Sequence, residues 1–217
     1  MATPDGARPG TEFYRRAPIA VAYDLLGCLI VSDRLPGRVA GRIVEVESYA
    51  GPEDEASHAG KYAAGSAAMF GAPGRAYVYR SYGIHTMLNV VGHEDGVAGA
   101  ILIRAVEPTH GVQRMAVRRG RDSSHQLCNG PGRLCQAFDI RLTDNGLDLL
   151  TSRDLWIERG TRPRSVLCGE RIGISKAREA HWRLFVGDNR FVSVHRRGFL
   201  CDPDCLPVLV SEQILPG

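Results

Sequence analysis

Acid–base chemistry could be carried by Glu47, with Tyr49 and His58 close behind it in the chain. Glu45 is expected to share the face of Glu47 and to support it, and we assign Glu45 no chemistry. These two glutamates and Tyr49 lie in GRVAGRIVEVESYAG, which alternates apolar and polar residues and is rich in β-branched side chains, a pattern that predicts a strand. A buried carboxylate is costly unless it has partners, so Glu47 beside Tyr49 is a candidate functional residue. An edge strand with solvated glutamates would give the same pattern. Strand alternation predicts one face with Ile43, Glu45, Glu47 and Tyr49, and the other with Val44, Val46 and Ser48.

A long glycine- and alanine-rich stretch, Gly51 to Gly74, follows this strand and carries His58. Loops of this length inside a compact domain are usually functional or disordered. Three consecutive acids near its start, Glu53, Asp54 and Glu55, are typical of a solvated turn or helix start. We assign them no chemistry and expect them to shape the turn that carries His58.

The next segment, RAYVYRSYGIHTMLNVVG, predicts a β-hairpin. Its first strand runs from Ala76 to Arg80, its turn covers residues 81–83, and its second strand continues through Val91. Tyr77 and Tyr79 share one face of the first strand, where they could be core aromatics or the walls of a pocket.

Tyr82 falls at the turn of this hairpin, where its ring is expected to be exposed, with Arg75, Arg80 and His85 flanking it. An exposed aromatic side chain between basic residues is hard to explain as core. Proteins that extract a base from duplex DNA need a wedge, a basic surface and a stacking pocket. The hairpin and the preceding strand could supply all three.

The rest of the chain predicts mixed helices and strands. A helix is expected from Pro18 to about Gly27, and a helix with a basic face in THGVQRMAVRRGR. Between them GVAGAILIRAVEP predicts a strand that ends in Arg104 and Glu107. Gly130, Pro131 and Gly132 precede another helix, whose first amides could face a phosphate or could be an ordinary helix start. Two short strands are expected around the turn at residues 187–189.

Composition indicates one soluble domain. The chain has 217 residues, 44% of them hydrophobic, and no apolar run approaches a membrane span. The N-terminus lacks the order of a secretory signal, so we expect a cytoplasmic protein, and we expect residues 1–12 to be flexible. Only Lys61 and Lys176 among 27 basic residues are lysines, and the pI near 8.6 fits a nucleic-acid partner without requiring one. The six cysteines contain no Cys-x-x-Cys pair, which favours reduced, buried thiols over a metal site.

Several blocks of this sequence together resemble the signature blocks of the alkyladenine (3-methyladenine) DNA glycosylase family. They are GRIVEVESYAGPEDEASHA, MFGAPGRAYVYRSYGIHTMLNVV, ILIRAVEP and NGPGRLCQAF, with the later ERIGIS and HWRLFV. The resemblance extends from Phe13 to Val194, and ordered blocks are more specific than any single motif. It implies a single α+β domain over residues 13–217, with a curved, mostly antiparallel sheet, packed helices and a protruding hairpin that contacts DNA.

The resemblance also implies a catalytic centre. Glu47 matches the glutamate that accepts a proton from the water attacking the anomeric carbon of the sugar. Arg104 and the backbone carbonyl of Ile172 match the groups that hold this water. No cofactor or metal is implied, and no lysine is evident as a Schiff-base nucleophile, so base removal without strand cutting is expected.

The same resemblance implies how damaged DNA is bound. Tyr49, His58 and Tyr79 match the walls and hydrogen-bonding edge of the base pocket, and Asn89 matches the asparagine that disfavours normal guanine. Tyr82 matches the intercalating tyrosine. Candidate contacts to the DNA backbone are Arg75, Arg80, Gly130, Gly132 and Arg133.

The implied function is a monomeric, nucleoid-associated enzyme that excises alkylated or deaminated purines from double-stranded DNA and so begins base excision repair. One departure from the family pattern suggests an alternative. Many members carry a Thr-x-Arg-Asn element where this chain has GKYAAGSAAMF after His58, so a catalytically weak or inactive lesion-binding protein is the second hypothesis. Retention of Glu47, Arg104 and Asn89 argues against it. Hydrolysis of free nucleosides is a third, and the exposed Tyr82 argues against that.

Overall fold

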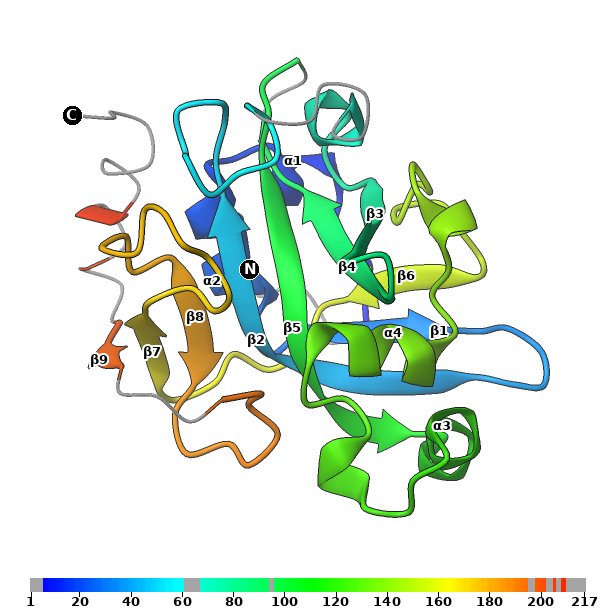
Figure 1. The fold of residues 1–217 in the computed structure, drawn as a ribbon. Coiled ribbons are helices and arrows are strands. Elements are labelled where there is room, and N and C mark those ends of the chain that lie inside the picture. The colour runs from blue at the N-terminus through cyan, green and yellow to red at the C-terminus, as the bar shows by residue number, and fades with distance from the viewer. Residues whose placement is uncertain are drawn as a thin grey trace.

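The computed structural model describes residues 6–60, 67–93, 96–194, 198–201, 205 and 208–209. Within them, one antiparallel sheet is surrounded by short helices, so the expected α+β class is confirmed (Figure 1). The helices are α1 (Thr11–Tyr14), α2 (Pro18–Leu25), α3 (Val112–Arg119) and α4 (Pro131–Phe138), with 3-10 turns η1 (Ala67–Phe70), η2 (Ser124–Gln126) and η3 (Leu142–Asp144). The strands are β1 (Leu29–Ser32), β2 (Val39–Tyr49), β3 (Ala76–Ser81), β4 (His85–Val91), β5 (Ala100–His110), β6 (Leu155–Glu158), β7 (Val166–Gly169), β8 (Arg183–Val186) and β9 (Phe199–Leu200).

The two longest strands, β2 and β5, pair along the middle of the sheet and curve through the molecule (Figure 1). The strand order is β3-β4-β5-β2-β8-β7-β9. On its other edge β2 changes neighbour: residues 39–42 pair with β1, which also pairs with β6, and residues 45–47 pair with β8. The far half of β2, which carries the glutamates, is thereby held between β5 and β8.

Three irregularities interrupt the pairing of β2 with β5: one lies between Ala40 and Gly41, and the other two lie on either side of Glu45. The register leaves Val44 of β2 and Arg104 of β5 without a residue opposite. Ile43 and Val46 both lie in the main core, whereas Val44 packs in a separate cluster with Ala105. An extra residue in a strand disturbs its alternation. The prediction that Ile43 shares a face of the strand with the glutamates, and that Val44 shares a face with Val46, is therefore wrong.

Helices α2 and α4 pack on the strands that carry the site. Helix α2 begins at Pro18 as predicted, because the fixed φ of proline suits the first helical turn, and it packs on β2 and β5. Helix α4 begins at Pro131 and packs on β4 and β5 through buried residues that include Leu134 and Phe138. Among the described residues, the longest helices have eight residues, and none is long and apolar enough to cross a membrane.

The C-terminal half differs from its prediction. Strand β8 precedes the turn at residues 187–189 as expected, but residues 191–194 form no strand. Their backbone groups bond side chains instead: the Phe191 amide donates to Asn189 Oδ1, and the Ser193 amide donates to Glu45 Oε2. Strand β5 continues to His110, beyond its predicted end.

The N-terminal segment is joined to the sheet. The Gly6 amide donates to the carbonyl of Arg159, and the Arg159 amide donates to the carbonyl of Ala7. The guanidinium of Arg8 donates to the carbonyls of Leu150 and Ser152. Residues 1–5 of the segment expected to be flexible lie outside the described residues, whereas residues 6–12 are docked or begin α1.

Candidate active site

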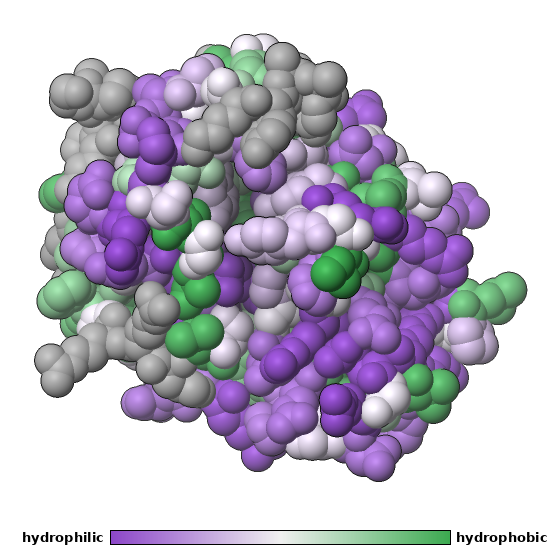
Figure 2. Space-filling view, in the orientation of Figure 1, coloured by the Kyte–Doolittle hydropathy of each residue, from purple (hydrophilic) through white to green (hydrophobic). Residues whose placement is uncertain are grey.

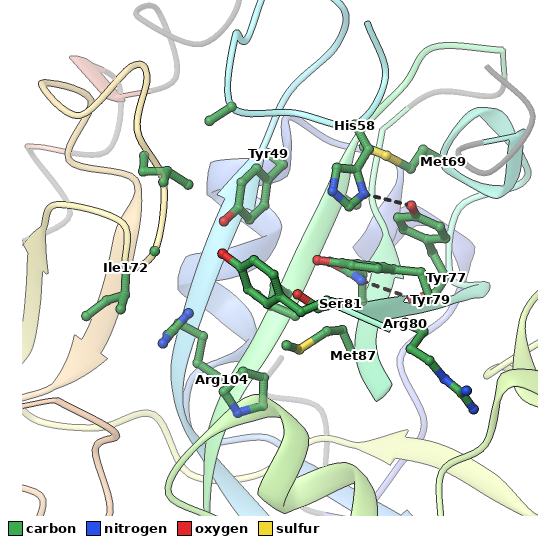
Figure 3. Close-up of a pocket in the computed structure, with 18 of the residues that line it drawn as sticks. Tyr49, His58, Met69, Tyr77, Tyr79, Arg80, Ser81, Met87, Arg104 and Ile172 are labelled. Atoms are coloured by element: carbon green, nitrogen blue, oxygen red, sulfur yellow. Dashed lines mark hydrogen bonds between the residues drawn. The ribbon is translucent and has the colours of Figure 1, made fainter. Parts of the chain in front are cut away.

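A cavity of about 850 Å³ lies between the β3–β4 hairpin, the far half of β2 and two loops, residues 50–60 and 170–177 (Figure 3). Figure 2 shows it as a hollow with a largely hydrophilic border. It brings together most of the predicted site residues. These are Tyr49, His58, Tyr79, Arg80, Tyr82, Asn89, Arg104 and Ile172, joined by residues that were not predicted, Met69, Met87 and Pro131 among them.

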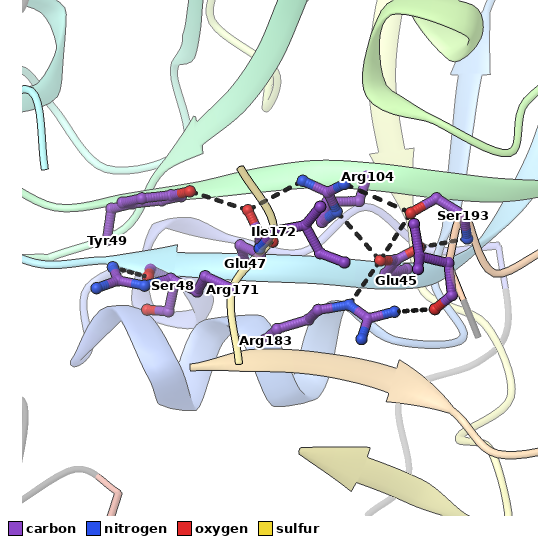
Figure 4. A network of polar contacts seen from close by, with 10 residues as sticks. Glu45, Glu47, Ser48, Tyr49, Arg104, Arg171, Ile172, Arg183 and Ser193 are labelled. Atoms are coloured by element: carbon purple, nitrogen blue, oxygen red, sulfur yellow. Dashed lines mark hydrogen bonds and ion pairs between the residues drawn. The ribbon is translucent and has the colours of Figure 1, made fainter. Parts of the chain in front are cut away.

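Glu47 lies directly behind this lining, and its side chain is completely inaccessible to solvent. Its carboxylate accepts three hydrogen bonds (Figure 4). Tyr49 Oη and Arg104 Nη1 donate to Oε2 at 2.9 and 3.1 Å, and the Ile172 amide donates to Oε1 at 2.6 Å. All three donors belong to residues that line the cavity. The contact made by Ile172 uses its amide, whereas the sequence assigned a role to its carbonyl.

Glu45 is also completely buried, and it anchors Arg104 from the other side. Its carboxylate accepts hydrogen bonds from Arg104 Nε at 3.1 Å, from Arg183 Nε at 2.7 Å, and from the amide and hydroxyl of Ser193. Burial alone would raise the pKa of Glu45, but Arg104, Arg183 and Ser193 outweigh burial and lower the pKa. Glu45 therefore remains ionised and fixes the Arg104 guanidinium beneath the cavity.

Two of the donors around Glu47 are held in the protonated form. Burial, followed by the charge of Glu47, raises the pKa of Tyr49 well above its ordinary value, so its phenol remains a hydrogen-bond donor. Burial opposes the charge of Arg104, but the carboxylates of Glu47 and Glu45 outweigh burial and raise its pKa. The site is therefore a buried carboxylate surrounded by fixed donors, an arrangement suited to positioning a nucleophile and stabilising positive charge.

Aromatic rings form the wall of the cavity beside the loop of residues 50–60 (Figure 3). Tyr77 and Tyr79 stack with ring centroids 5.3 Å apart, and His58 meets Tyr79 edge-on at 4.5 Å. His58 Nδ1 lies 3.0 Å from Tyr77 Oη, so Tyr77 orients the histidine. Burial raises the pKa of Tyr79 to about 12, which keeps its hydroxyl protonated. The sequence left Tyr77 between a core residue and a wall, and the structure places it in both.

Asn89 closes the floor of the cavity from β4, where it pairs with Tyr77 on one side and Leu102 on the other. Its side chain is almost fully buried, and Nδ2 donates to the carbonyl of Tyr77 at 3.1 Å. This bond fixes the orientation of the amide, so the residue presents a rigid polar surface to whatever occupies the cavity.

The hairpin forms as predicted, but its turn covers residues 82–84 and not 81–83, because Ser81 still belongs to β3 and pairs with His85. Tyr82 adopts a positive φ of 50° and is 86% exposed, and Ile84 beside it is 75% exposed. Positive φ is uncommon for residues other than glycine. The predicted exposure of Tyr82 is confirmed, and Ile84 adds apolar surface that the sequence did not single out.

The predicted contacts to a DNA backbone fall in different places. Gly132, in the first turn of α4, lies against His85 of the hairpin, and Gly130 is the N-cap residue of α4. Arg133 is exposed on α4, with Nη1 donating to Asn129. Arg80 is exposed on the hairpin near Tyr82, whereas Arg75 lies at the other end of β3 and donates to the carbonyl of Gly146.

The acidic run after β2 does not behave as one group. Glu53 and Glu55 are exposed, as expected for a solvated turn. Asp54 is 4% exposed and binds the buried guanidinium of Arg171 through both carboxylate oxygens, so its prediction as a solvated acid is wrong. Residues 61–66, which include most of the atypical stretch after His58, lie outside the described residues.

The described cysteines form no disulfide, and five of the six are buried. Burial raises the pKa of Cys128 to about 12, so this thiol is protonated at neutral pH. In the part of the chain that the structure describes, no three His, Cys, Asp or Glu side chains gather in a way that could hold a metal ion.

Comparison with known proteins agrees with this geometry. Residues 12–190 match the family model described as methylpurine-DNA glycosylase. A protein of Rhodopseudomonas palustris (strain HaA2), named "Putative 3-methyladenine DNA glycosylase", is 45% identical over 84% of this chain and 89% of its own length. A protein of the same name from Desulfitobacterium hafniense (strain Y51) is 41% identical over 86% of this chain and 98% of its own. The family model covers most of the chain, including Glu47 and its three donor residues, and the chain belongs to the methylpurine-DNA glycosylase family.

Proposed function

We propose that this DNA glycosylase flips alkylated or deaminated purines out of duplex DNA and hydrolyses their N-glycosidic bond with a water activated by Glu47. The observation that carries the proposal is the position of Glu47, completely buried and held by three donors directly behind a cavity of purine-accommodating size. A buried carboxylate with this many fixed partners is typical of a functional site.

The cavity suits a flat, cationic base. The rings of Tyr49, Tyr79 and His58 line it, and the electron-rich faces of the tyrosines favour a positively charged alkylated purine over a neutral one. A damaged base also costs less to unstack and unpair, so selection begins before the base reaches the cavity. Asn89 acts in this proposal as the rigid surface that disfavours the amino group of guanine.

The chemical step uses the ionised form of Glu47. Water oxygen forms a bond to the anomeric carbon while the N-glycosidic bond breaks, and the bonding electron pair leaves with the base. The proton of the water passes to Glu47, and an alkylated base departs neutral because it was cationic when bound. Arg104 and the backbone of Ile172, both beside the carboxylate, hold the water, and the negative charge of Glu47 stabilises the positive charge that develops on the sugar.

The hairpin supplies the wedge. Tyr82 enters the minor groove and occupies the space of the flipped nucleotide, with the exposed Ile84 widening the apolar tip. The duplex backbone is held by Arg80, Arg133 and the start of α4. One chain supplies the cavity, the carboxylate and the wedge, so the enzyme acts as a monomer.

Substitution of Glu47 by Gln tests the proposal directly. The amide has the same shape but cannot accept the proton, so release of alkylated adenine from duplex DNA should fall by about 10²–10⁴-fold, while binding of the lesion duplex should change little. Single-turnover base release and equilibrium binding to hypoxanthine and alkylated-adenine duplexes would be measured for both proteins.

Glu107→Gln, which removes an acid on β5, the strand that pairs with β2, away from the cavity, is the control and should retain full activity. Normal release by Glu47→Gln would show that another group activates the water. Tight lesion binding without release by the unsubstituted enzyme would favour the lesion-binding alternative.

A further inference from the structure

A second buried ion pair lies behind the cavity, between Arg171 and Asp54. Both side chains are completely buried, and the guanidinium forms two parallel hydrogen bonds to the carboxylate at 2.6 and 2.9 Å. Neither residue lines the cavity, and neither has a role in the chemistry proposed above.

Arg171 is packed between aromatic rings as well as paired. Its guanidinium carbon lies 4.7 Å from the ring centroid of Tyr49 and 4.9 Å from that of Trp182. Nη1 also donates to the carbonyl of Ser48 at 3.0 Å (Figure 4). The guanidinium therefore covers a part of the Tyr49 ring that is turned away from the cavity, and it holds the end of β2.

The ion pair joins the two loops on opposite sides of the cavity. Asp54 accepts hydrogen bonds from the amides of Ala50 and Ala56, so it organises the loop that carries His58. Arg171 immediately precedes Ile172, whose amide donates to Glu47 at 2.6 Å. A shift of Arg171 would thus move a donor of the catalytic carboxylate and the ring of Tyr49 together.

A buried ion pair is weak evidence for a role in stability, because desolvation of both charges offsets much of their attraction. The contacts of this pair favour a role in the site. We propose that Arg171, held by Asp54, is a positioning residue for catalysis: it keeps the Ile172 amide on Glu47 and the Tyr49 ring against the cavity. This inference rests on the proposed function of Glu47.

Two variants test the inference without leaving an unpaired buried charge. Arg171→Lys keeps the positive charge beside Asp54 but loses the planar fork and the stacking. The double variant Arg171→Gln with Asp54→Asn removes both charges. In each, we expect single-turnover base release to fall by about 10- to 100-fold, because small displacements of catalytic groups have effects of that order. The dissociation constant for the lesion duplex should rise by only about 3-fold, less than the loss of rate, because Tyr82, Arg80 and Arg133 still hold the duplex and only the Tyr49 wall of the cavity is disturbed.

Glu55→Gln is the matched control, because Glu55 and Lys176 form an exposed ion pair between the same two loops and Glu55 does not line the cavity. It should release base at the normal rate, since exposed pairs contribute little. Normal release by both Arg171 variants would overturn the inference. So would loss of rate in proportion to loss of binding, which would indicate a general disturbance of the fold.

Hydrogen exchange of the Ile172 amide gives a second readout that does not depend on activity. The amide should exchange slowly in the unsubstituted protein and at least about 10-fold faster in both Arg171 variants, because the bond to Glu47 would open more often. Unchanged exchange would overturn the positioning role even if the unsubstituted enzyme released no base. Absence of release together with the expected change in exchange would overturn the proposed function of Glu47 alone.

Discussion

Glu45 and Glu47 lie on one face of β2, yet their partners give them different tasks. The partners of Glu45 other than Arg104, which are Arg183 and Ser193, do not line the cavity, whereas each donor to Glu47 belongs to a residue that lines it. Arg104 bonds both carboxylates and so couples Glu45 to Glu47, the acid proposed to be catalytic. The two residues are of the same type on the same strand, and their different surroundings give them different roles.

Glu45→Gln is predicted to destabilise the protein, because it leaves Arg104 and Arg183 buried beside a neutral group. The free energy of unfolding at pH 7 should fall by about 3–5 kcal/mol. Since the folded-state pKa of Glu45 is lowered, its stabilisation is present above the unfolded-state pKa of about 4.3 and is lost as the pH falls through the lower folded-state value. Urea unfolding at several pH values would check this.

The difference in stability between Glu45→Gln and the unsubstituted protein should therefore narrow below about pH 4. Glu53→Gln, at an exposed acid in the following loop, is the control and should change stability little at any pH. A deficit that does not depend on pH would mean that the shape of the side chain matters and its charge does not.

For single residues, some roles could be predicted from the sequence and others could not. Glu47 and Tyr49 could be predicted as neighbours because strand alternation operates over two residues. Asp54 could not be distinguished from Glu53 and Glu55, since its partner Arg171 lies 117 residues away in the chain. The role of a charged residue in a loop depends on such distant contacts, which no local pattern contains.

In the proposed function, the β3–β4 hairpin is the element that contacts DNA most directly. Its turn holds Tyr82 at a positive φ, and α4 packs on β4, where Gly132 lies against His85, the first residue after the turn. The wedge is thus mounted on a strand pair that also carries Tyr77, Tyr79 and the cavity floor.

Tyr82→Asn removes the ring while keeping a residue type that tolerates positive φ. Affinity for a lesion in duplex DNA should fall by about 10- to 100-fold, because the space left by the flipped base would be unfilled, which costs roughly 1–3 kcal/mol of stacking. Affinity for a lesion in single-stranded DNA should change less, since no partner strand needs to be held apart. Fluorescence anisotropy with both substrates would measure this.

Thr86→Ala, at a strand position below the tip, is the matched control. Equal affinity of Tyr82→Asn and the unsubstituted enzyme for the duplex lesion would remove the wedge role from Tyr82. The hairpin would then have to act through Ile84 or not at all.

The elements with strong local patterns were predicted, whereas several short strands were not. Helices α2, α3 and α4, strand β2 and the hairpin all have periodicity or a turn with clear residue preferences. The four-residue strand β8 was predicted with the help of the turn that follows it. Strands β6, β7 and β9 have four residues or fewer, too few for a period to be recognised, and each pairs with another strand of four residues.

The net charge of the whole molecule is only +3, and it does not show where the residues proposed to bind DNA lie. The hairpin and the start of α4 border the cavity on one face, whereas α2 lies behind β2 (Figure 1). Binding to a duplex is expected to depend on arginines beside the cavity more than on total charge.

Arg133→Ala should weaken binding to damaged and undamaged duplexes alike. Loss of one phosphate contact should reduce the slope of log affinity against log salt concentration by about 1. Arg162→Ala is the matched control, because it makes the same change in net charge beside Asp24 of α2. Titrations at several salt concentrations would check both. Equal slopes for the two variants would contradict a backbone contact by Arg133.

The irregularities at Val44 of β2 and at Arg104 of β5 have opposite effects on the register of the two strands. Val44 is the additional residue on one strand and Arg104 on the other, so the pairing before them and after them has the same register. Deleting either residue alone would displace all pairs beyond it by one position and turn the face that carries Glu47 inward. The lengths of these two strands are therefore linked: an insertion or deletion in one is tolerable only with a matching change in the other, although 55 residues of chain separate the last residue of β2, Tyr49, from Arg104.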